Sequence, residues 1–567
     1  MSNKSWGYKK FTLYIITLQI ITVLYWGNQK KNYYIDDLYS ISYAQSFTGQ
    51  GDTAQYITTS SDFSFNEWID SQSLKKHLIL SDKEKFYRSS VSDFLDRLIN
   101  RRNYYGLLNI SESILGISPI SVWPGIILNI FFLIVFDILL LLLLAKLGID
   151  GKLRVLSLIM LGFSTYIIST TCYTRFYMLV IMLQLIVLSL IYKMWNSTKY
   201  TSITIYELAT LITIYFSYKN SELTLIYFFG IEASIILFSI IMKRWKQLIV
   251  NISVCIIGVI YIAISINYIE IVTHPELFAN STSVAVRASN SITNFNVISL
   301  IRFLCGIGTI FATMYFAGYI VLSLFVIVGI LILLTIAKNR HKEIYQKEFK
   351  RKINLSSNDS YIILVLLSVV IYTLLCAMCA FHGIWRYYFY GFVSTAIIIW
   401  YVVDRILKSN SIKKAKNKYI VLLTVFVVIN AIMPFFKRNI DFLYENEKEF
   451  VCKIKDNQNL DVVLCINVKD INNKKTISRH ETYDCVYHMS EQSKIYCIDL
   501  AQYKYEDIDY PDRFLLWSHC DSEYGDLTDI IKDLEANNYT VELLGIDHCS
   551  KVYQCELKWH ENINDIP

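Results

Sequence analysis

The sequence has little charge and few of the residues that interrupt regular structure. Only 18% of its 567 residues are charged, and it contains 6 prolines and 20 glycines. Hydrophobic residues make up 54% of the chain, and the mean hydropathy is +0.37. Its apolar stretches approach or exceed the roughly 20 residues needed to cross a bilayer. This composition predicts a polytopic integral membrane protein.

Several common motifs are absent from the sequence. There is no GxxxxGK[ST] element and no glycine-rich loop between a strand and a helix, so a soluble nucleotide-binding site is not predicted. The net charge of +6 resides in basic loops and gives no argument for a nucleic-acid partner. No repeat with a period of 20–50 residues and no low-complexity tract occurs.

Window hydropathy predicts about eleven transmembrane helices. The first is expected to remain as an anchor, because no small-residue cleavage site follows YWGNQKK. The segment 297–314, with Arg302 inside it, is predicted to be a re-entrant or interfacial helix. The predicted spans are 11–27, 122–146, 153–171, 174–193, 202–217, 222–242, 247–268, 318–337, 361–381, 387–404 and 419–436.

Basic residues predict the orientation of these spans. Lysine and arginine are concentrated in four segments, 4–10, 243–246, 338–352 and 408–418. The positive-inside rule places such segments in the cytoplasm. With an odd number of spans, the amino terminus is then cytoplasmic and the carboxyl terminus external. Abundant Ile, Asn, Lys and Tyr indicate an AT-rich bacterial genome, so the expected location is the plasma membrane.

A long external loop, residues 28–121, is predicted between the first two spans. A loop of this length in a compact protein is usually functional. Its start carries two adjacent carboxylates, Asp36 and Asp37, in YYIDDLYSISYAQ, and SVSDFLDRLI within it has the spacing of an amphipathic surface helix. Near its end lie four further candidates, Arg101, Arg102, Tyr104 and Tyr105.

Two other external segments are rich in arginine and tyrosine. CYTRFYML contributes Arg175 and Tyr177, and FHGIWRYYFYG contributes Arg386 and Tyr387. Arginine binds phosphate oxygens in a bidentate way, and aromatic rings stack on sugars. An alternative for each arginine is anchoring at the level of the lipid headgroups, and interfacial tyrosines are common in membrane proteins.

Together these residues fit a site for a lipid-linked sugar phosphate. A carboxylate would act as general base toward an acceptor hydroxyl, and arginine would offset the charge that develops on the departing lipid phosphate. Membrane lipids are expected partners, and the acceptor would be a glycan, a lipid or a protein. No obligatory metal is predicted, because no zinc-site spacing occurs, although Asp36, Asp37, His274 and Glu276 could supply ligands to a divalent ion.

The order of these motifs resembles the C-type fold of membrane glycosyltransferases, the class that includes protein O-mannosyltransferases and bacterial aminoarabinose transferases. The resemblance covers about residues 10–405 and consists of IDDLYS after one span, a Tyr-Tyr element ending a long loop, TRFYML and WRYY. It implies a polyprenyl-phosphate sugar donor.

Carried over by position, the resemblance implies that Asp36 is the catalytic base and Asp37 its partner acid. It implies that Arg175 with Tyr177 is the Arg-x-Tyr element and that Arg386 with Tyr387 is the late Arg-Tyr element, in which Arg386 contacts the donor phosphate and Tyr387 the substrate. One departure is LINRRNYYGLLN, where many bacterial relatives have Asp-x-His-Pro-Pro-Leu-Tyr-Tyr. Leu98 stands in place of the acid and Asn100 in place of the histidine. Altered or reduced activity is therefore an alternative.

The predicted domains are a membrane domain, 1–436, and a soluble extracytoplasmic α/β domain, 437–567. Within the tail, DVVLCINV, RFLLWSH and TVELLGI resemble strands, and GDLTDIIKDLEANN resembles an amphipathic helix. Seven of the 12 cysteines lie there. Such density permits disulfides in an exported domain, but the odd number leaves their pairing open.

Two competing functions remain open at this stage. One is a polymerase or ligase of lipid-linked glycans, which would use the same basic external face. The other is a transporter or flippase, which would place acids and Gly or Pro breaks in the middle of spans. Asp137 and Glu232 are the few such acids, and prolines are scarce, so the sequence favours an enzyme.

Overall fold

The computed structural model describes most of the helical part of the chain and most of the tail. The described residues are 3–32, 37–38, 40–41, 44, 56–58, 66–75, 103–115, 121–221, 223–265, 297–315, 356–378, 388–408, 416–438, 440–444, 447–466, 469–471, 474–500, 503–519, 527–547 and 550–558. The chain divides into two compact units. The first comprises Met1–Leu24, Asn129–Thr171 and Phe176–Asp441, and the second comprises Tyr25–Leu128, Cys172–Arg175 and Phe442–Pro567.

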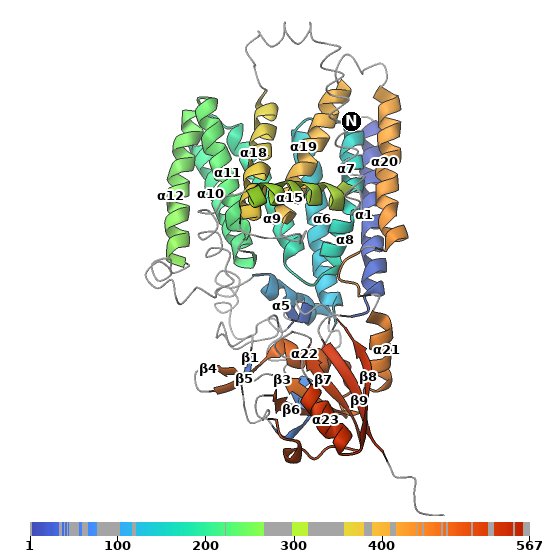
Figure 1. Ribbon diagram of the computed structural model, residues 1–567. Coiled ribbons are helices and arrows are strands. Elements are labelled where there is room, and N and C mark those ends of the chain that lie inside the picture. Colours follow the sequence, from blue (N-terminus) through green and yellow to red (C-terminus); the bar gives the residue numbers. More distant parts are fainter. Residues whose placement is uncertain are drawn as a thin grey trace, which may run out of the picture. The chain divides into compact units, whose positions relative to one another are not determined.

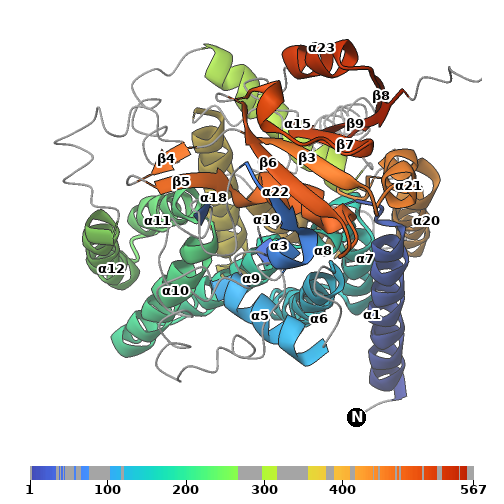
Figure 2. The same ribbon diagram turned by 90° about the horizontal axis from the view of Figure 1, so that it is seen from below.

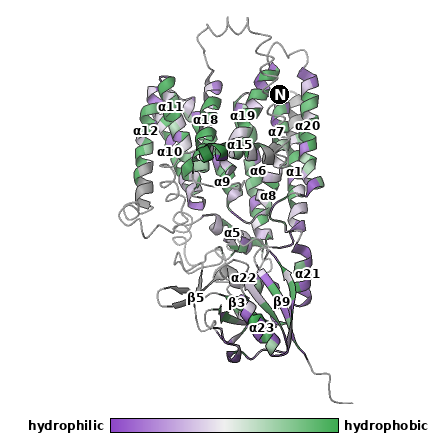
Figure 3. Cartoon of the chain, viewed as in Figure 1, coloured by the Kyte–Doolittle hydropathy of each residue, from purple (hydrophilic) through white to green (hydrophobic). Residues whose placement is uncertain are grey.

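Long apolar helices make up the first unit, and Figure 3 shows their hydrophobic colouring. Over the described residues, seven helices are long and apolar enough to cross a membrane, or eight if the bent pair α7 and α8 counts as one span. The protein is therefore a polytopic integral membrane protein. The helices of this part are α1 (Asn3–Gln29), α6 (Trp123–Lys146), α7 (Gly151–Gly162), α8 (Thr165–Cys172), α9 (Tyr177–Trp195), α10 (Tyr200–Asn220), α11 (Leu223–Ile241), α12 (Trp245–Ser265), α15 (Val297–Tyr315), α18 (Ser357–Met378), α19 (Phe389–Lys408) and α20 (Lys416–Lys437).

Most of the predicted spans coincide with these helices. The predicted span 153–171 is the bent pair, whose halves meet at an angle of 54°. The predicted spans 202–217 and 247–268 are helices, α10 and α12, but neither is among the seven long apolar ones. The segment 318–337 lies outside the described residues. The total of about eleven spans therefore stays a prediction.

The segment 297–314 forms the helix α15, which lies crosswise to the bundle helices in Figure 1. Its apolar part, Val297–Phe311, is shorter than the candidate spans. Gly391 of α19 permits its close approach, because a Cβ at that position would lie 2.5 Å from Ile310 Cδ1. The re-entrant or interfacial placement of α15 stays a prediction.

Hydrogen bonds between buried polar groups connect several helices of the bundle. Gln184 of α9 directs its amide nitrogen at Tyr390 O at 2.6 Å and at Tyr227 Oη at 3.0 Å. The rings of Tyr227 and Tyr390 stack with their centroids 4.5 Å apart. Because an unpaired polar group is costly away from water, these contacts fix the register of α9, α11 and α19.

The second unit contains a six-stranded sheet with the order β2-β6-β3-β7-β9-β8. The strand β3 pairs in parallel with both β6 and β7, and the remaining pairings are antiparallel. The strands are β2 (Trp68–Asp70), β3 (Asp461–Ile466), β6 (Lys494–Asp499), β7 (Arg513–His519), β8 (Tyr539–Ile546) and β9 (Ser550–Leu557). The strands and the helix expected from the tail sequence are confirmed.

Alternating residues of the central strands fill two separate cores. On β3, Val462 and Leu464 face one core and Val463 faces the other. The first core packs against the helices α21 (Lys448–Asp456) and α22 (Arg479–His488), and the second packs against α23 (Thr528–Ala536). Figure 2 shows α22 and α23 on opposite sides of the sheet. The period of two along a strand produces this division.

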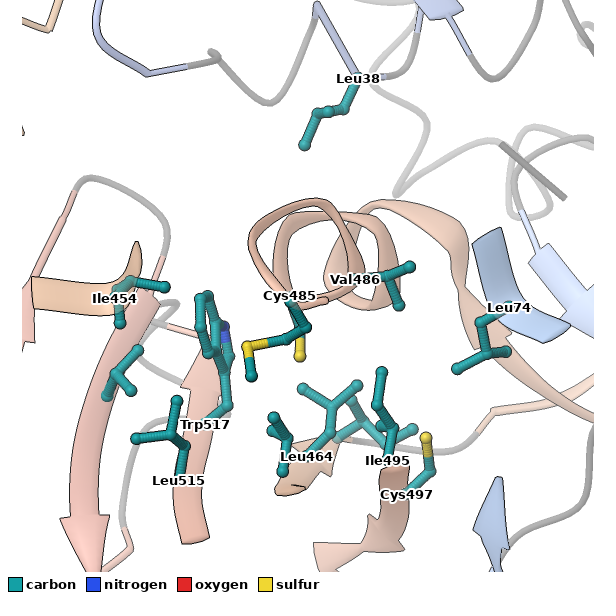
Figure 4. Close-up of a cluster of buried hydrophobic side chains, with 14 of the residues drawn as sticks. Leu38, Leu74, Ile454, Leu464, Cys485, Val486, Ile495, Cys497, Leu515 and Trp517 are labelled. Carbon is teal, nitrogen blue, oxygen red and sulfur yellow. The ribbon is translucent and has the colours of Figure 1, made fainter. Parts of the chain in front are cut away.

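Figure 4 shows the first core, in which Trp517, Leu464 and Ile495 lie on one side of the helix α22. The His488 ring stacks on Trp517, with the centroids 5.9 Å apart. Burial lowers the pKa of His488 to about 4, so this imidazole is neutral at neutral pH.

One strand of this sheet comes from the long loop between the first two predicted spans. The strand β2 pairs antiparallel with β6, with Ile69 opposite Ile495. A second, three-stranded sheet likewise joins β1 (Tyr56–Thr58) from the loop with β5 (Lys474–Ser478) and β4 (Lys469–Ile471) from the tail. The loop and the tail thus share both sheets.

The described cysteines of the tail are free thiols. Cys465, Cys485, Cys497 and Cys555 are buried, and Cys452 is exposed. Burial raises the pKa of Cys497 and of Cys555 to about 12, so these thiols are protonated and unreactive. The two remaining cysteines of the tail, Cys520 and Cys549, lie outside the described residues.

Candidate functional site

The carboxylate of Asp37 is buried in the second unit, where it forms an ion pair and a backbone hydrogen bond. Lys30, which directly follows α1, places its Nζ atom 2.6 Å from Asp37 Oδ2. The side chains of Lys30 and Asp37 are 2% and 0% exposed. The backbone N–H of Thr174 donates to Asp37 Oδ1 at 2.7 Å. Both oxygens of this carboxylate therefore accept charge-assisted or backbone hydrogen bonds.

The segment that carries Asp37 is also anchored by apolar contacts. Leu38 and Ile41 are 2% and 1% exposed and belong to the first core of the tail sheet. Figure 4 shows Leu38 beside the helix α22. Two kinds of contact, the ion pair and the core, thus fix the position of Asp37.

Thr174, the backbone donor to Asp37, belongs to a short turn between α8 and α9. Lys30 Nζ also donates to Cys172 O at 3.4 Å, and Arg175 N donates to Tyr173 O at 2.7 Å. The Tyr173 ring stacks on Phe442, with the centroids 3.9 Å apart and the planes 9° apart. Phe442 has a φ of 66°, the left-handed region that is uncommon for a bulky residue. The turn is thus held from several sides.

Arg175, the next residue after Thr174, connects this turn to the end of the long loop. Its Nη1 atom donates to Tyr105 Oη at 2.8 Å. Tyr105 and its neighbour Tyr104 begin the helix α5 (Asn103–Leu115), and their exposures are 6% and 0%. Asn109, one turn further along α5, donates to Ala44 O at 2.9 Å. The helix is therefore tied to the segment that follows Asp37.

The structure thus brings together three of the motifs predicted from sequence. Asp37 of the acidic pair, Arg175 of TRFYML and Tyr105 of the Tyr-Tyr element are connected through Thr174 N–H and the Arg175–Tyr105 hydrogen bond. In the sequence, Tyr105 stands 68 residues after Asp37, and Arg175 stands 70 residues after Tyr105. All three lie in the second unit.

Of the remaining predicted site residues, Tyr177 belongs to the first unit, and five lie outside the described part of the chain. Tyr177 is the first residue of α9, and its ring meets Phe389 edge to face at 5.6 Å. Phe389 begins α19, three residues after Arg386. The predicted site residues that lie outside the described part are Asp36, Arg101, Arg102, Arg386 and Tyr387.

Sequence reasoning missed Lys30 as a site residue. Lys30 and Lys31 follow a hydrophobic span, and Lys30 stands seven residues before Asp37. The signal in the sequence is that both lysines stand on the external side of the predicted topology, where the positive-inside rule disfavours them. The Lys30 ammonium neutralises Asp37, and the Arg175 guanidinium donates to Tyr105.

No group of three or more His, Cys, Asp or Glu residues among the described ones has the arrangement of a metal site. Two of the possible ligands named from sequence, His274 and Glu276, fall outside that part of the chain, as does Asp36. A guanidinium group such as that of Arg175 is of the kind that binds phosphate and carboxylate oxygens.

Comparisons with known proteins gave a structural likeness only. No protein-family model matches the sequence, and no curated protein matches it. The crystal structure of ArnT from Cupriavidus metallidurans bound to undecaprenyl phosphate is similar at 7% identity and a TM-score of 0.47, covering 98% of each chain. The apo structure of the same protein has 9% identity and a TM-score of 0.48, covering 97% of this chain and 98% of that one. ArnT is an aminoarabinose transferase of the C-type fold, one of the classes that the motif order resembles.

Proposed function

We propose that this protein is a membrane glycosyltransferase that moves a sugar from a polyprenyl-phosphate carrier to a glycan, lipid or protein of the cell envelope. The observation that carries the proposal is the cluster of Asp37, Arg175 and Tyr105, which unites three distant sequence motifs. Buried ionisable residues beside spanning helices are functional-site candidates.

In this proposal the two adjacent carboxylates have different roles. Asp37 is buried and ion-paired, so it is suited to positioning the chain segment and not to accepting a proton from a substrate. Asp36 is the general base. It takes the proton of the acceptor hydroxyl as the acceptor oxygen forms its bond to the anomeric carbon of the sugar.

The bond between the anomeric carbon and the phosphate oxygen breaks in the same reaction, and its electron pair stays on the polyprenyl phosphate. Arg175 offsets that charge from within the described cluster, and Arg386, Arg101 and Arg102 are the other proposed phosphate contacts. Tyr104, Tyr105, Tyr177 and Tyr387 would bind the sugar or keep the arginines in place.

The proposed topology has about eleven spans with the amino terminus in the cytoplasm. The α/β tail, 437–567, then lies outside the plasma membrane together with the long loop, and the reaction takes place on that side. The proposed partition is a membrane domain, 1–436, followed by this tail. No metal is required by the proposal, because arginine supplies the positive charge.

The test measures loss of lipid-linked sugar by mass spectrometry. Purified protein in lipid nanodiscs is incubated with a panel of polyprenyl-phosphate sugars, and wild type is compared with Asp36→Asn. We expect consumption by the wild type alone, with at least a hundredfold loss in the variant, the size typical of removing a general base. Asp512→Asn, a change at an exposed tail residue, serves as the matched control. Equal turnover in wild type and Asp36→Asn would refute the assignment of the base.

A second candidate function is a transporter or flippase for lipid-linked glycans, and one observation favours it. Asn251 of α12 donates through its amide to Glu207 of α10, at 2.7 Å, and to Glu232 of α11. The two glutamates are 1% and 4% exposed. Buried acids among membrane helices are typical of proton-coupled transport. Loss of proton-driven flux in Glu232→Gln, with no donor consumed by the wild type, would favour this alternative.

A further inference from the structure

The first unit contains a cavity that the proposed function does not use. This cavity of about 570 Å³ is formed by the α9–α10 turn, by the α11–α12 turn and by Ser357, where α18 begins. It lies among helix ends of the bundle and involves none of the residues assigned to the glycosyltransferase site.

All the charged residues that line this cavity are basic. Lys243, Arg244 and Lys246 belong to it, and no acidic residue is among the lining residues. These three cations also take part in none of the ion pairs found among the described residues. The excess of three positive charges in one cavity is suited to a ligand with a phosphate group.

Hydrogen bonds and ring contacts make the walls of the cavity well defined. The Arg244 guanidinium lies 4.4 Å from the centroid of Trp195 and donates to the carbonyl of the same residue. Lys246 Nζ donates to Thr198 O at 3.1 Å. Gln247, which is 6% exposed, donates to Ser197 O at 3.0 Å. The α9–α10 turn is therefore fixed against the α11–α12 turn.

Three helices also begin at this cavity. The residues Tyr200, Trp245 and Ser357 are the first of α10, α12 and α18, and all three belong to the lining. The backbone N–H groups of a first helical turn point away from the helix and favour an anion. These donors add to the three cationic side chains.

The helix α12, whose first residue lines the cavity, has an exposed apolar face. Trp245 is 57% exposed, and Ile249 and Ile256 further along the helix are 54% and 55% exposed. Positions 245, 249, 252, 256 and 260 recur at intervals of three or four residues and so occupy one face of the helix. An aromatic residue at the start of an exposed apolar face is typical of the boundary between headgroups and acyl chains.

We propose that this cavity binds the phosphate of an anionic membrane lipid, with the acyl chains along the exposed face of α12. The cations select a negatively charged headgroup, and the exposed isoleucines distinguish a lipid from a soluble phosphate. In the predicted orientation the α11–α12 turn is cytoplasmic, the leaflet side on which basic pockets between spanning helices bind anionic headgroups.

The experiment is native mass spectrometry of the full-length protein in a neutral detergent, titrated with phosphatidylglycerol or phosphatidylcholine. We expect one phosphatidylglycerol to bind more tightly than phosphatidylcholine. In Lys243→Gln/Lys246→Gln we expect that preference to fall about 30-fold, the effect of two lysines near an anionic lipid surface. Replacement of both lysines by arginine is expected to retain it. Inorganic phosphate at millimolar concentration is expected not to compete.

A matched control removes two exposed lysines elsewhere, in Lys152→Gln/Lys418→Gln. An equal loss in this control would show general charge attraction and refute a specific site. Unchanged binding in the cavity variant, with an unchanged elution profile and melting temperature, would also refute it. Competition by inorganic phosphate at millimolar or lower concentration would identify a soluble phosphate ligand and overturn the assignment to a lipid.

Discussion

Lys30 and Asp37 form an ion pair that is almost completely removed from solvent, and this isolation determines what either residue can do. Two charges lose their hydration in such a place, and only their mutual contact and nearby hydrogen bonds compensate for it. Asp37 Oδ1 accepts from Thr174 N, and Lys30 Nζ donates to Cys172 O. The pair therefore connects the end of the first helix to the turn that carries Arg175.

Removing one member of this pair is expected to destabilise the protein more than removing both. Lys30→Met or Asp37→Asn leaves one polar group without its partner, at a cost of about 3–5 kcal/mol. The double variant Lys30→Met/Asp37→Leu replaces both charges with apolar groups and is expected to recover most of that loss. Thermal unfolding of the full chain in one detergent, followed by tryptophan fluorescence, measures all three. Additive losses in the double variant would contradict this coupling.

The two acids of the pair also show how far single residues can be interpreted from sequence. IDDLYS predicted an important carboxylate beside a membrane helix, and Asp37 has the burial and the contacts that such a residue requires. The resemblance implied the division of roles between Asp36 and Asp37, and that division stays a prediction because Asp36 lies outside the described residues. Lys30 was not predicted, because contact between Lys30 and Asp37 depends on the turn of the chain between them.

At the scale of elements, the first turn of α6 lies against the turn that carries Thr174. Gly125 permits this approach, because a Cβ on Gly125 would lie 2.2 Å from Thr174 Cγ2. A contact that short forces either the helix or the Thr174 turn to move. The hydrogen bond from Thr174 N to Asp37 would move with it.

Gly125→Ala is accordingly expected to destabilise the protein by about 1–3 kcal/mol, the usual cost of overpacking, and to lower transferase turnover. Gly308→Ala in α15 is the matched control, because nothing lies within 4 Å of a Cβ there, and alanine is the better helix former. Melting temperature and donor consumption would be measured for both variants. A melting temperature of Gly125→Ala equal to that of the control would show that the turn adjusts without cost.

The strand β2 is the element that sequence patterns were least able to predict. It has only three residues, Trp68–Asp70, and it completes one edge of a sheet whose next strand begins at Lys494. A run of three residues is too short for the period of two to be recognised. By contrast, the longer strands β7 and β8 were predicted nearly to the residue, because each carries an apolar run of strand length.

At the scale of the whole molecule, the distribution of lysine and arginine predicts which side of the membrane each segment faces. The described part of the basic loops includes Lys243, Arg244 and Lys246, and these cations line one cavity. The tail contains the strands and the two cores of a soluble fold. Its predicted location is outside the cell, the side on which the proposed reaction takes place.

Fusion reporters at the carboxyl terminus test this orientation. Alkaline phosphatase, which requires export to fold, is expected to be active after residue 567, and green fluorescent protein at the same place is expected to be dark. The control inserts the same reporters in the predicted cytoplasmic loop after Lys418, where the outcomes should be reversed. A fluorescent carboxyl-terminal fusion would show an even number of spans and would move the proposed reaction to the cytoplasmic side.

The sequence by itself determined the membrane class, most helices and three strands of the tail, because hydropathy and short periods are local properties of the chain. Only the tertiary structure decided that the long loop contributes β2 to the tail sheet. It also decided that one turn contacts two distant segments, since Thr174 N donates to Asp37 and Arg175 donates to Tyr105. Such contacts depend on chain turns and on the burial of charge, and neither leaves a periodic signal in the sequence.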